Sequence, residues 1–381
     1  MPCEISQRAR LSVTTLTLSP NLSRNIGTLS SIASPLSDGS DAIAALPNQH
    51  AMASKATRYA NLDILRLFLA TNVVVLHCMK TGLAQFLPLV ATFVCLSGLL
   101  IPDSFTRSTS YGQFAIKRIA RVGPGLIISL FIVALLFGFP AMKSTFLYYL
   151  TVGVVLPYAT SKDPALWSLM LEEILYAGHC LVRKTKFLWR PAYIFVIYAI
   201  LTFTTLYLYY HPQIHFPGIE SYRLPYAFSI ASTFVVGNFA CLYKPLVKRI
   251  PWKIAGIAFV LATAAWLLRW NLGWFYYVFS VHLAALSAIV FGYVTPQIKW
   301  KFPDISYGVY VYHTPIIFAI QARSSLDGYA LLAVVLPIII AVSIASWYLA
   351  EGPALAYKDR LVQASRTKAR ATAEELARAN T

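Results

Sequence analysis

Asp63, Arg66 and His77 lie inside or at the edges of an apolar stretch of the sequence, residues 61–80, which read NLDILRLFLATNVVVLHCMK. Arg66 and His77 are eleven residues apart, about three turns of an α-helix, so they share one helix face about 16 Å apart along the axis. A charged group at membrane depth costs roughly 2.5–3.5 kcal/mol, and such groups normally face a protein interior or a hydrated cavity. The pair therefore predicts a functional polar column within a membrane helix. The alternative is an Arg66 that reaches one interface and a His77 that is merely hydrogen-bonded at the other.

Three cations follow in the segment FAIKRIARVGPG, namely Lys117, Arg118 and Arg121. Guanidinium groups bind phosphate oxygens through paired hydrogen bonds, so a cationic cluster at the cytoplasmic end of a helix suits a phosphate-bearing ligand. The alternative is the ordinary attraction of basic residues to anionic lipid. The spacing alone leaves both interpretations open.

Carboxylates and a second histidine occur in other apolar stretches. Glu172 and Glu173 lie in LWSLMLEEILY, where a buried carboxylate could orient a histidine or form a structural ion pair with an arginine. His313 lies within SYGVYVYHTPI, and by itself it is interpreted as a hydrogen-bonded membrane histidine. Glu351, in SWYLAEGP after the last apolar run, is interpreted as an interfacial carboxylate near Lys358.

The composition is that of an integral membrane protein. Of the 381 residues 57% are hydrophobic and only 12% are charged, against roughly 25% in a soluble domain, and the mean hydropathy is +0.60. The net charge of +17 is divided among short clusters between apolar runs, which argues against a nucleic-acid partner. The five cysteines are dispersed and form no CxxC pair, so neither a metal site nor a disulfide framework is predicted.

The apolar runs of near-spanning length predict about ten transmembrane helices. They cover residues 61–80, 83–102, 122–140, 165–182, 191–210, 224–243, 252–270, 274–293, 304–321 and 329–349. Lysines and arginines gather in alternate loops between these runs, which places those loops and both termini in the cytoplasm. The sequence therefore predicts an all-α polytopic membrane bundle. A further apolar piece, 144–158, is short and is expected to be re-entrant or interfacial.

Both ends of the chain differ from this pattern. Residues 1–57 are rich in Ser, Thr, Ala and Asn and lack a signal-peptide core, so we expect a disordered extension, with Met52 as an alternative start. Residues 58–355 form the predicted transmembrane domain. Residues 356–381 alternate Ala with charged residues, which is typical of a partly helical cytoplasmic tail, and no chemistry is assigned to them.

Taken in order, these motifs resemble those of the acyltransferase-3 family of membrane-bound acyltransferases. Arg66 and His77 are similar to the Arg-x10-His signature of the family, SGLLI to its SGFLI and KRIAR to its RRxxRI. LWSLMLEE resembles LWSLxxE, SYGVYVYHTPI resembles SYxxYLxHxP, and YLAEGP resembles the final VExP. The sequence departs from the pattern at Lys117, which replaces an Arg and cannot make the bidentate contact, and at Gly352, where a Lys often stands.

The resemblance implies transfer of an acyl group, usually acetyl, from cytoplasmic acyl-CoA to a sugar hydroxyl at or beyond the outer face of a bacterial inner membrane. The expected acceptors are cell-surface or exported carbohydrates such as lipopolysaccharide and exopolysaccharide. Acyl-CoA is then a co-substrate, with no permanently bound cofactor and no metal. The implied partners are the carbohydrate acceptor, the lipid bilayer and polysaccharide biosynthesis or export machinery, without nucleic acid.

The resemblance also implies roles for individual residues. His77 would act as general base on the sugar hydroxyl or hold the acyl group transiently. Arg66 would stabilise the oxyanion or fix the thioester, and Glu172 would orient or charge-balance His77. The phosphates of acyl-CoA would be held by Lys117, Arg118 and Arg121. Supporting positions would be Ser97, Tyr307 and His313.

Two other classes of protein share some of these features. A secondary transporter of a small anionic or sugar substrate would also bury Arg, His and Glu, but it should show paired, broken helices in two matched halves, which the sequence lacks. A haem-binding electron carrier would use His77 and His313 as axial ligands, and a Soret band in the purified protein would reveal it.

Overall fold

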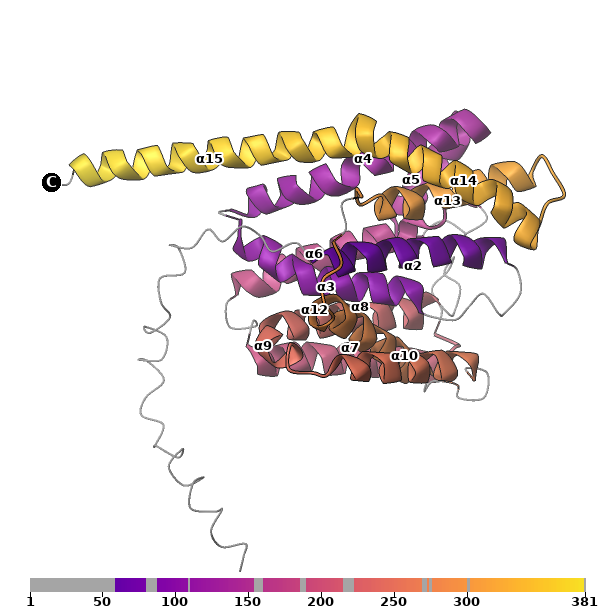
Figure 1. Cartoon of the computed structure of the whole chain (residues 1–381), viewed down its shortest axis with the longest axis horizontal. Coiled ribbons are helices and arrows are strands. Elements are labelled where there is room, and N and C mark those ends of the chain that lie inside the picture. Colours follow the sequence, from indigo (N-terminus) through magenta and orange to yellow (C-terminus); the bar gives the residue numbers. More distant parts are fainter. Residues whose placement is uncertain are drawn as a thin grey trace, which may run out of the picture. The chain divides into compact units, whose positions relative to one another are not determined.

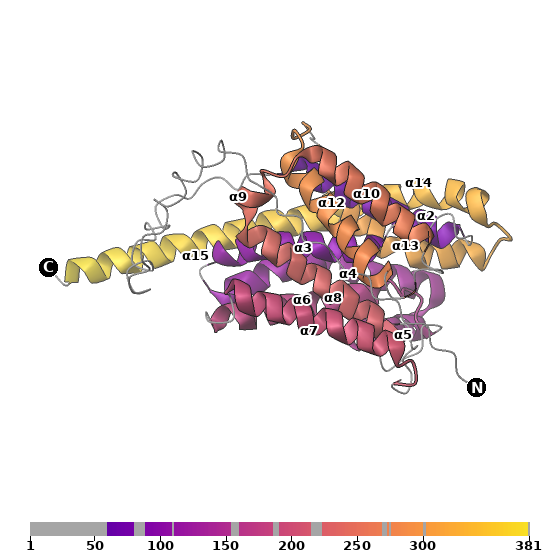
Figure 2. The ribbon, with the colours of Figure 1, turned by 90° about the horizontal axis from the view of Figure 1, so that it is seen from below.

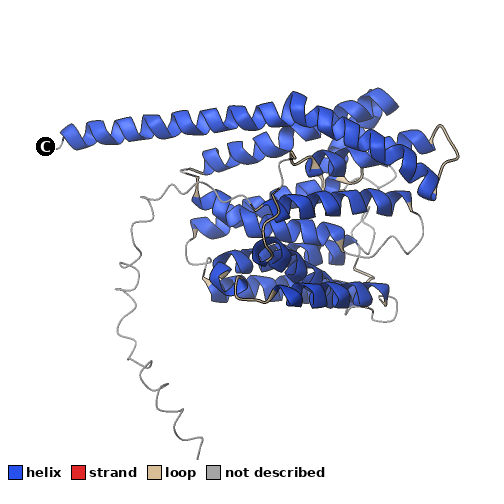
Figure 3. Cartoon of the chain, in the orientation of Figure 1, coloured by secondary structure: helices blue, strands red, loops and turns tan. Residues whose placement is uncertain are grey.

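The computed structural model describes residues 59–79, 88–108, 110–153, 160–185, 190–214, 223–268, 273, 276–299 and 302–379. Its regular structure is helical throughout, with no strand among the described residues (Figure 3). The predicted all-α class is therefore confirmed. The expected N-terminal extension, residues 1–57, lies outside the described residues.

Every predicted span coincides with a helix. These helices are α2 (Ala60–Cys78), α3 (Leu89–Thr106), α4 (Tyr111–Phe137), α6 (Leu166–Lys184), α7 (Pro191–Tyr210), α8 (Arg223–Leu242), α10 (Trp252–Leu267), α12 (Val281–Val294), α13 (Ser306–Gln321) and α14 (Gly328–Ser346). Six helical segments among the described residues are long and apolar enough to cross a membrane. The polytopic membrane bundle is thus supported, while the number of ten spans and the cytoplasmic termini stay predictions.

Shorter helical elements connect or extend these helices. They are α5 (Phe139–Leu150), α9 (Lys244–Val247), the π-helical turns η5 (Tyr276–Ser280) and η6 (Trp347–Glu351), and α15 (Gly352–Ala379). The short apolar piece expected at 144–158 contributes the end of α5. Gly138, with φ +87°, ends α4 and begins α5 in a conformation that favours glycine.

Two glycines let α3 and α8 pack with their backbones in close approach. A Cβ atom on Gly98 would lie 2.1 Å from the carbonyl oxygen of Phe234, and one on Gly237 would lie 2.2 Å from that of Cys95. Small residues at helix contacts are the usual means of close packing inside a membrane. Gly98 directly follows Ser97, so this contact fixes the part of α3 that faces the site described below.

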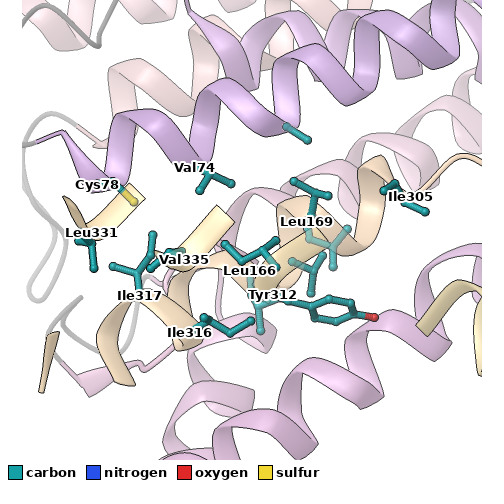
Figure 4. Packing of buried hydrophobic residues seen from close by; sticks show 14 of the residues in the cluster. Val74, Cys78, Leu166, Leu169, Ile305, Tyr312, Ile316, Ile317, Leu331 and Val335 are labelled. Atoms are coloured by element: carbon teal, nitrogen blue, oxygen red, sulfur yellow. The ribbon is translucent and has the colours of Figure 1, made fainter. Parts of the chain in front are cut away.

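A buried apolar cluster joins α2, α6, α13 and α14 (Figure 4). Val74 and Cys78 on α2 pack near Ile317 on α13 and Val335 on α14, and all four side chains are at most 1% exposed. Figures 1 and 2 show α7 beside α8 and α10 beside α12, two pairs that are in contact. This packing places the polar faces of α2, α3, α4, α6 and α13 around two cavities.

Candidate active site

A cavity of about 370 Å³ lies among α2, α3, α4, α6, α13 and the start of α15. Its lining is rich in positive charge. The cations that line it are Arg66, Arg107, Lys117, Arg118, Arg121 and Lys358. The three predicted phosphate-binding residues therefore share one cavity with Arg66. A cavity with this charge is suited to an anionic ligand.

Asp304 holds two of these cations in place. Its carboxylate lies 2.5 Å from a guanidinium nitrogen of Arg121 and 3.9 Å from one of Arg66, and it also accepts hydrogen bonds from the backbone N–H and hydroxyl of Ser306. Burial favours the protonated form of Asp304, but Arg121 and Arg66 outweigh this effect and lower the pKa of the carboxyl below its usual value. Asp304 is therefore an anion in the segment that leads into α13, and it fixes α2 and α4 to that segment.

Arg118 and Lys117 have different partners. The Arg118 guanidinium donates to the Ser104 hydroxyl at 3.2 Å and lies 5.6 Å from the ring centre of Phe114 and 5.9 Å from that of Tyr176. Aromatic faces stabilise a guanidinium without neutralising its charge. Lys117 donates to the Ser108 hydroxyl at 2.8 Å. The printed contacts of Arg118 thus include a hydroxyl and two aromatic faces, and Lys117 is held beside Ser108 at the edge of the same cavity.

Glu172 lies in this same cavity and not beside His77. Its carboxylate accepts hydrogen bonds from the hydroxyls of Ser97 and Tyr176. Among the described residues no hydrogen bond or ion pair joins Glu172 to His77. Ser97 therefore supports Glu172 through a direct contact, and the carboxylate adds negative charge to the cationic wall rather than to the histidine.

His77 lines a second, smaller cavity of about 110 Å³ together with Trp167, Tyr226 and Tyr310. The Nδ1–H of His77 donates to the carbonyl oxygen of Val73 at 2.8 Å, because a carbonyl can only accept. This bond leaves Nε2 of the neutral ring with a free electron pair. The arrangement gives His77 the orientation and the tautomer that a general base needs.

His313 is the residue that lies next to His77. The two ring centres are 4.7 Å apart with an angle of 64° between the planes, and His313 is fully buried. Nδ1 of His313 donates to the carbonyl oxygen of Tyr310 at 2.5 Å, and Nε2 lies 3.3 Å from the Thr314 hydroxyl. The two histidines are 236 positions apart in the sequence, and the fold brings them into one pair.

Tyr310 and Val90 line both cavities and form the wall between them. The Tyr310 hydroxyl is 2.5 Å from that of Ser168, and its ring centre is 5.6 Å from that of Phe93. The cationic cavity and the histidine cavity are therefore neighbours that share these two lining side chains. Arg66 lines the first and His77 the second, in agreement with their spacing along α2.

Tyr307 supports the cationic cavity from α13. Its hydroxyl donates to the Val122 carbonyl at 2.7 Å, and its ring occupies the space left by Gly125, where a Cβ atom would lie 2.2 Å from the ring. Gly125, the second glycine of KRIARVGPG, thus leaves room for the Tyr307 ring. Tyr307 ties α13 to α4, as its predicted supporting role requires.

The sequence interpretation of Glu351 was wrong. Its side chain is buried, not interfacial, and it accepts hydrogen bonds from the Ser346 hydroxyl at 2.8 Å and the Tyr312 hydroxyl at 3.3 Å. Asp304 and Lys358, which line or support the cationic cavity, received no role from the sequence. The position of Asp304 two residues before Ser306, at the entry of a motif-bearing helix, was the available signal for the first of them.

The described part of the chain contains no group of three or more His, Cys, Asp or Glu side chains that could hold a metal ion. Fold and site together define an all-α membrane protein whose cationic cavity adjoins the cavity lined by His77. A family model described as an acyltransferase domain matches residues 59–351. The chain therefore belongs to the acyltransferase-3 family and is a membrane acyltransferase, as the motifs predicted.

Comparison with curated proteins gives a relative that aligns with most of this chain. The chain is similar to Nodulation protein 10 of Rhizobium leguminosarum bv. viciae, with 26% identity over 354 residues, which cover 79% of this chain and 95% of the relative. No solved structure matches the chain. The relative's alignment thus extends over nearly its whole length, as expected for proteins that share a full membrane domain.

Proposed function

We propose that this protein transfers an acyl group, acetyl in the simplest case, from cytoplasmic acyl-CoA to a hydroxyl of a cell-surface or exported carbohydrate. The observation that carries the proposal is the shared wall of Tyr310 and Val90 between the cationic cavity and the His77 cavity. An anionic donor and a hydroxyl acceptor can then enter from different sides and meet at this wall. The proposed location is the bacterial inner membrane.

The donor belongs in the cationic cavity. CoA carries a diphosphate and a further phosphate, and its anionic head matches a lining that includes Arg118, Arg121 and Lys117. Arg118 is oriented by Ser104 and by two aromatic rings, so it can bind a phosphate oxygen without first breaking an ion pair. The neutral arm that carries the thioester would lie toward Tyr310.

The acceptor hydroxyl belongs beside His77. Nε2 of His77 takes the hydroxyl proton while the hydroxyl oxygen attacks the thioester carbonyl carbon. The C–S bond then breaks, and the CoA sulfur leaves with the proton that His77 returns. Arg66 lines the cationic cavity, about 16 Å along α2 from His77, and is proposed to fix the donor there. His313 packs against the His77 ring and holds it in place.

Replacement of the two histidines tests this assignment. His77→Ala should abolish transfer of a labelled acetyl group from acetyl-CoA to membrane glycans, because general-base catalysis contributes about 10²- to 10⁴-fold. His313→Gln keeps a hydrogen-bonding group and should retain measurable transfer. His211→Ala, at the end of α7 and outside both cavities, is the control. An active His77→Ala protein with an inactive His313→Gln protein would reverse the two roles.

The donor and the acceptor need separate experiments. Arg118→Gln and Arg121→Gln should each weaken acyl-CoA binding by roughly 1.5–3 kcal/mol, the value of a charged hydrogen bond, at unchanged protein abundance. Unaltered affinity in the double variant would return these arginines to lipid anchoring. For the acceptor, surface glycans from a deletion strain should lack an O-acyl group that the complemented strain restores.

A further inference from the structure

Helix α14 continues into α15 through the turn η6, which buried side chains hold in place. The π-helical turn η6 ends at Glu351, whose side chain is 2% exposed and is bonded to Ser346 and Tyr312. π-Helical turns are rare and occur often at functional sites. Because Glu351 is anchored to α13 through Tyr312, the direction in which α15 leaves the membrane helix is set by buried contacts.

This direction lays α15 against α4, the helix that carries Lys117, Arg118 and Arg121 (Figure 1). Leu355 and Lys358, three residues apart and therefore on one helix face, line the cationic cavity. Tyr357 and Arg360 are exposed on other faces. The family match ends at Glu351, so the contribution of α15 comes from a segment beyond the matched domain.

We propose that α15 completes the donor site and that Lys358 binds a phosphate of the CoA donor. The proposal rests on the proposed function. Lys358 is only 18% exposed, and its ammonium lies 2.9 Å from the carboxylate of Asp359, which is 66% exposed. A pair with such an exposed partner contributes little to stability, so a phosphate held by several cations in the cavity can displace Asp359.

The charges around Lys358 favour a phosphate over a nearby carboxylate as the partner of its ammonium group. Lys358 lines the cavity together with five other cations. Like charges repel each other, so an anion bound among them would make this position of the lysine more favourable. Two carboxylates in this region already have partners, since Asp304 binds Arg66 and Arg121 and Glu172 accepts from Ser97 and Tyr176. A multiply charged anion is the ligand class that a lining with six cations attracts most strongly.

The test measures CoA binding by the full-length protein in nanodiscs of zwitterionic lipid. Lys358→Gln should weaken CoA binding about tenfold. Arg360→Gln removes the same charge two residues away on an exposed face and should change affinity less than twofold. Asp359→Asn removes the competing carboxylate and should bind CoA at least as tightly as the wild type. Thermal unfolding of each variant checks that the helices remain folded.

Several results would overturn the assignment. Equal affinities of the Lys358→Gln and Arg360→Gln proteins would show that α15 does not reach the donor. If Lys358→Gln leaves CoA binding unchanged but weakens the binding of anionic lipid, the lysine binds a lipid phosphate instead. Suppose that the wild type binds CoA and that Arg118→Gln weakens CoA binding but Lys358→Gln does not. Only the role of Lys358 is then refuted, and the proposed function stands. If the wild type does not bind CoA, the proposed function fails as well.

Discussion

Asp304 provides a sharp test of the charge arrangement in the cationic cavity. Its replacement by Asn keeps the size of the side chain and its hydrogen bonds to Ser306, but it leaves Arg66 and Arg121 without their shared counter-charge. We expect a less stable protein whose stability is restored by an anionic ligand to a greater extent than in the wild type. Both effects have one cause, the repulsion between the two guanidinium groups, which the negative charge of Asp304 normally offsets.

The size of the effect follows from the geometry. One pair of unit charges about 4 Å apart contributes about 4 kcal/mol at an effective dielectric constant of roughly 20. Removing one partner of a buried pair costs roughly 3–5 kcal/mol. The side chains of Arg66 and Arg121 are 22% and 24% exposed, so water offsets part of the loss. We therefore expect a decrease of about 2–3 kcal/mol in the free energy of unfolding.

The pH dependence has a definite sign. The pKa of folded Asp304 lies below its usual value, since Arg121 and Arg66 outweigh the effect of burial. Its stabilising contribution is therefore complete above about pH 4, near the pKa of an unfolded aspartate, and is lost as the pH falls through the lowered pKa. The difference between wild type and Asp304→Asn should accordingly be constant from neutral pH down to about pH 5.

The assay is thermal unfolding in detergent with and without CoA. Asp327→Asn is the control, because Asp327 is exposed at the start of α14 and forms no side-chain capping bond there. CoA should raise the unfolding temperature of Asp304→Asn more than that of the wild type. Without the carboxylate the two arginines should bind the anion more tightly, and the stabilisation by a ligand of the folded state rises with the logarithm of its concentration over Kd. Equal unfolding temperatures for the two variants would refute the ion pair. A destabilised Asp304→Asn protein with no larger CoA effect would separate the arginines from the donor site.

Two further predictions concern the membrane bundle. Reporter fusions at Gln213 and Lys248 should lie on opposite sides of the membrane, with Gln213 external, and a common side would refute the predicted topology. Gly98→Ala should markedly reduce the amount of folded protein, because its Cβ atom would meet the Phe234 backbone, whereas Gly178→Ala on α6 meets no atom within 4 Å and should be tolerated.

The membrane helices were predictable because each depends on local composition. Hydropathy located the apolar runs, and the helix period placed Arg66 and His77 on one face of α2. The pairing of His77 with His313 was not predictable in this way. It depends on how α2 packs against α13, and the residues that decide this packing, such as Val74 and Ile317, look like any other apolar membrane residues in the sequence.

The polar contacts between elements distant in the sequence were the least predictable part of the site. Asp304 precedes a helix, and Lys358 lies in a charged segment with the composition of a solvated tail. Their roles depend on the directions of α13 and α15, which are fixed by distant contacts such as Tyr312 with Glu351. The Glu172 contact with Ser97 likewise depends on the approach of α3 to α6.

The division into two cavities bears on how a reaction between opposite sides of a membrane could proceed. Moving the phosphates of a donor past the Tyr310 wall would remove several charges from water and from their cations, at a cost of several kcal/mol for each. On the proposed function this movement is unnecessary. The phosphates stay among Arg118, Arg121 and Lys117, and only the neutral thioester end approaches Tyr310. A small acyl group then crosses the boundary as it is transferred, while both charged and sugar-bearing parts of the substrates remain on their own sides.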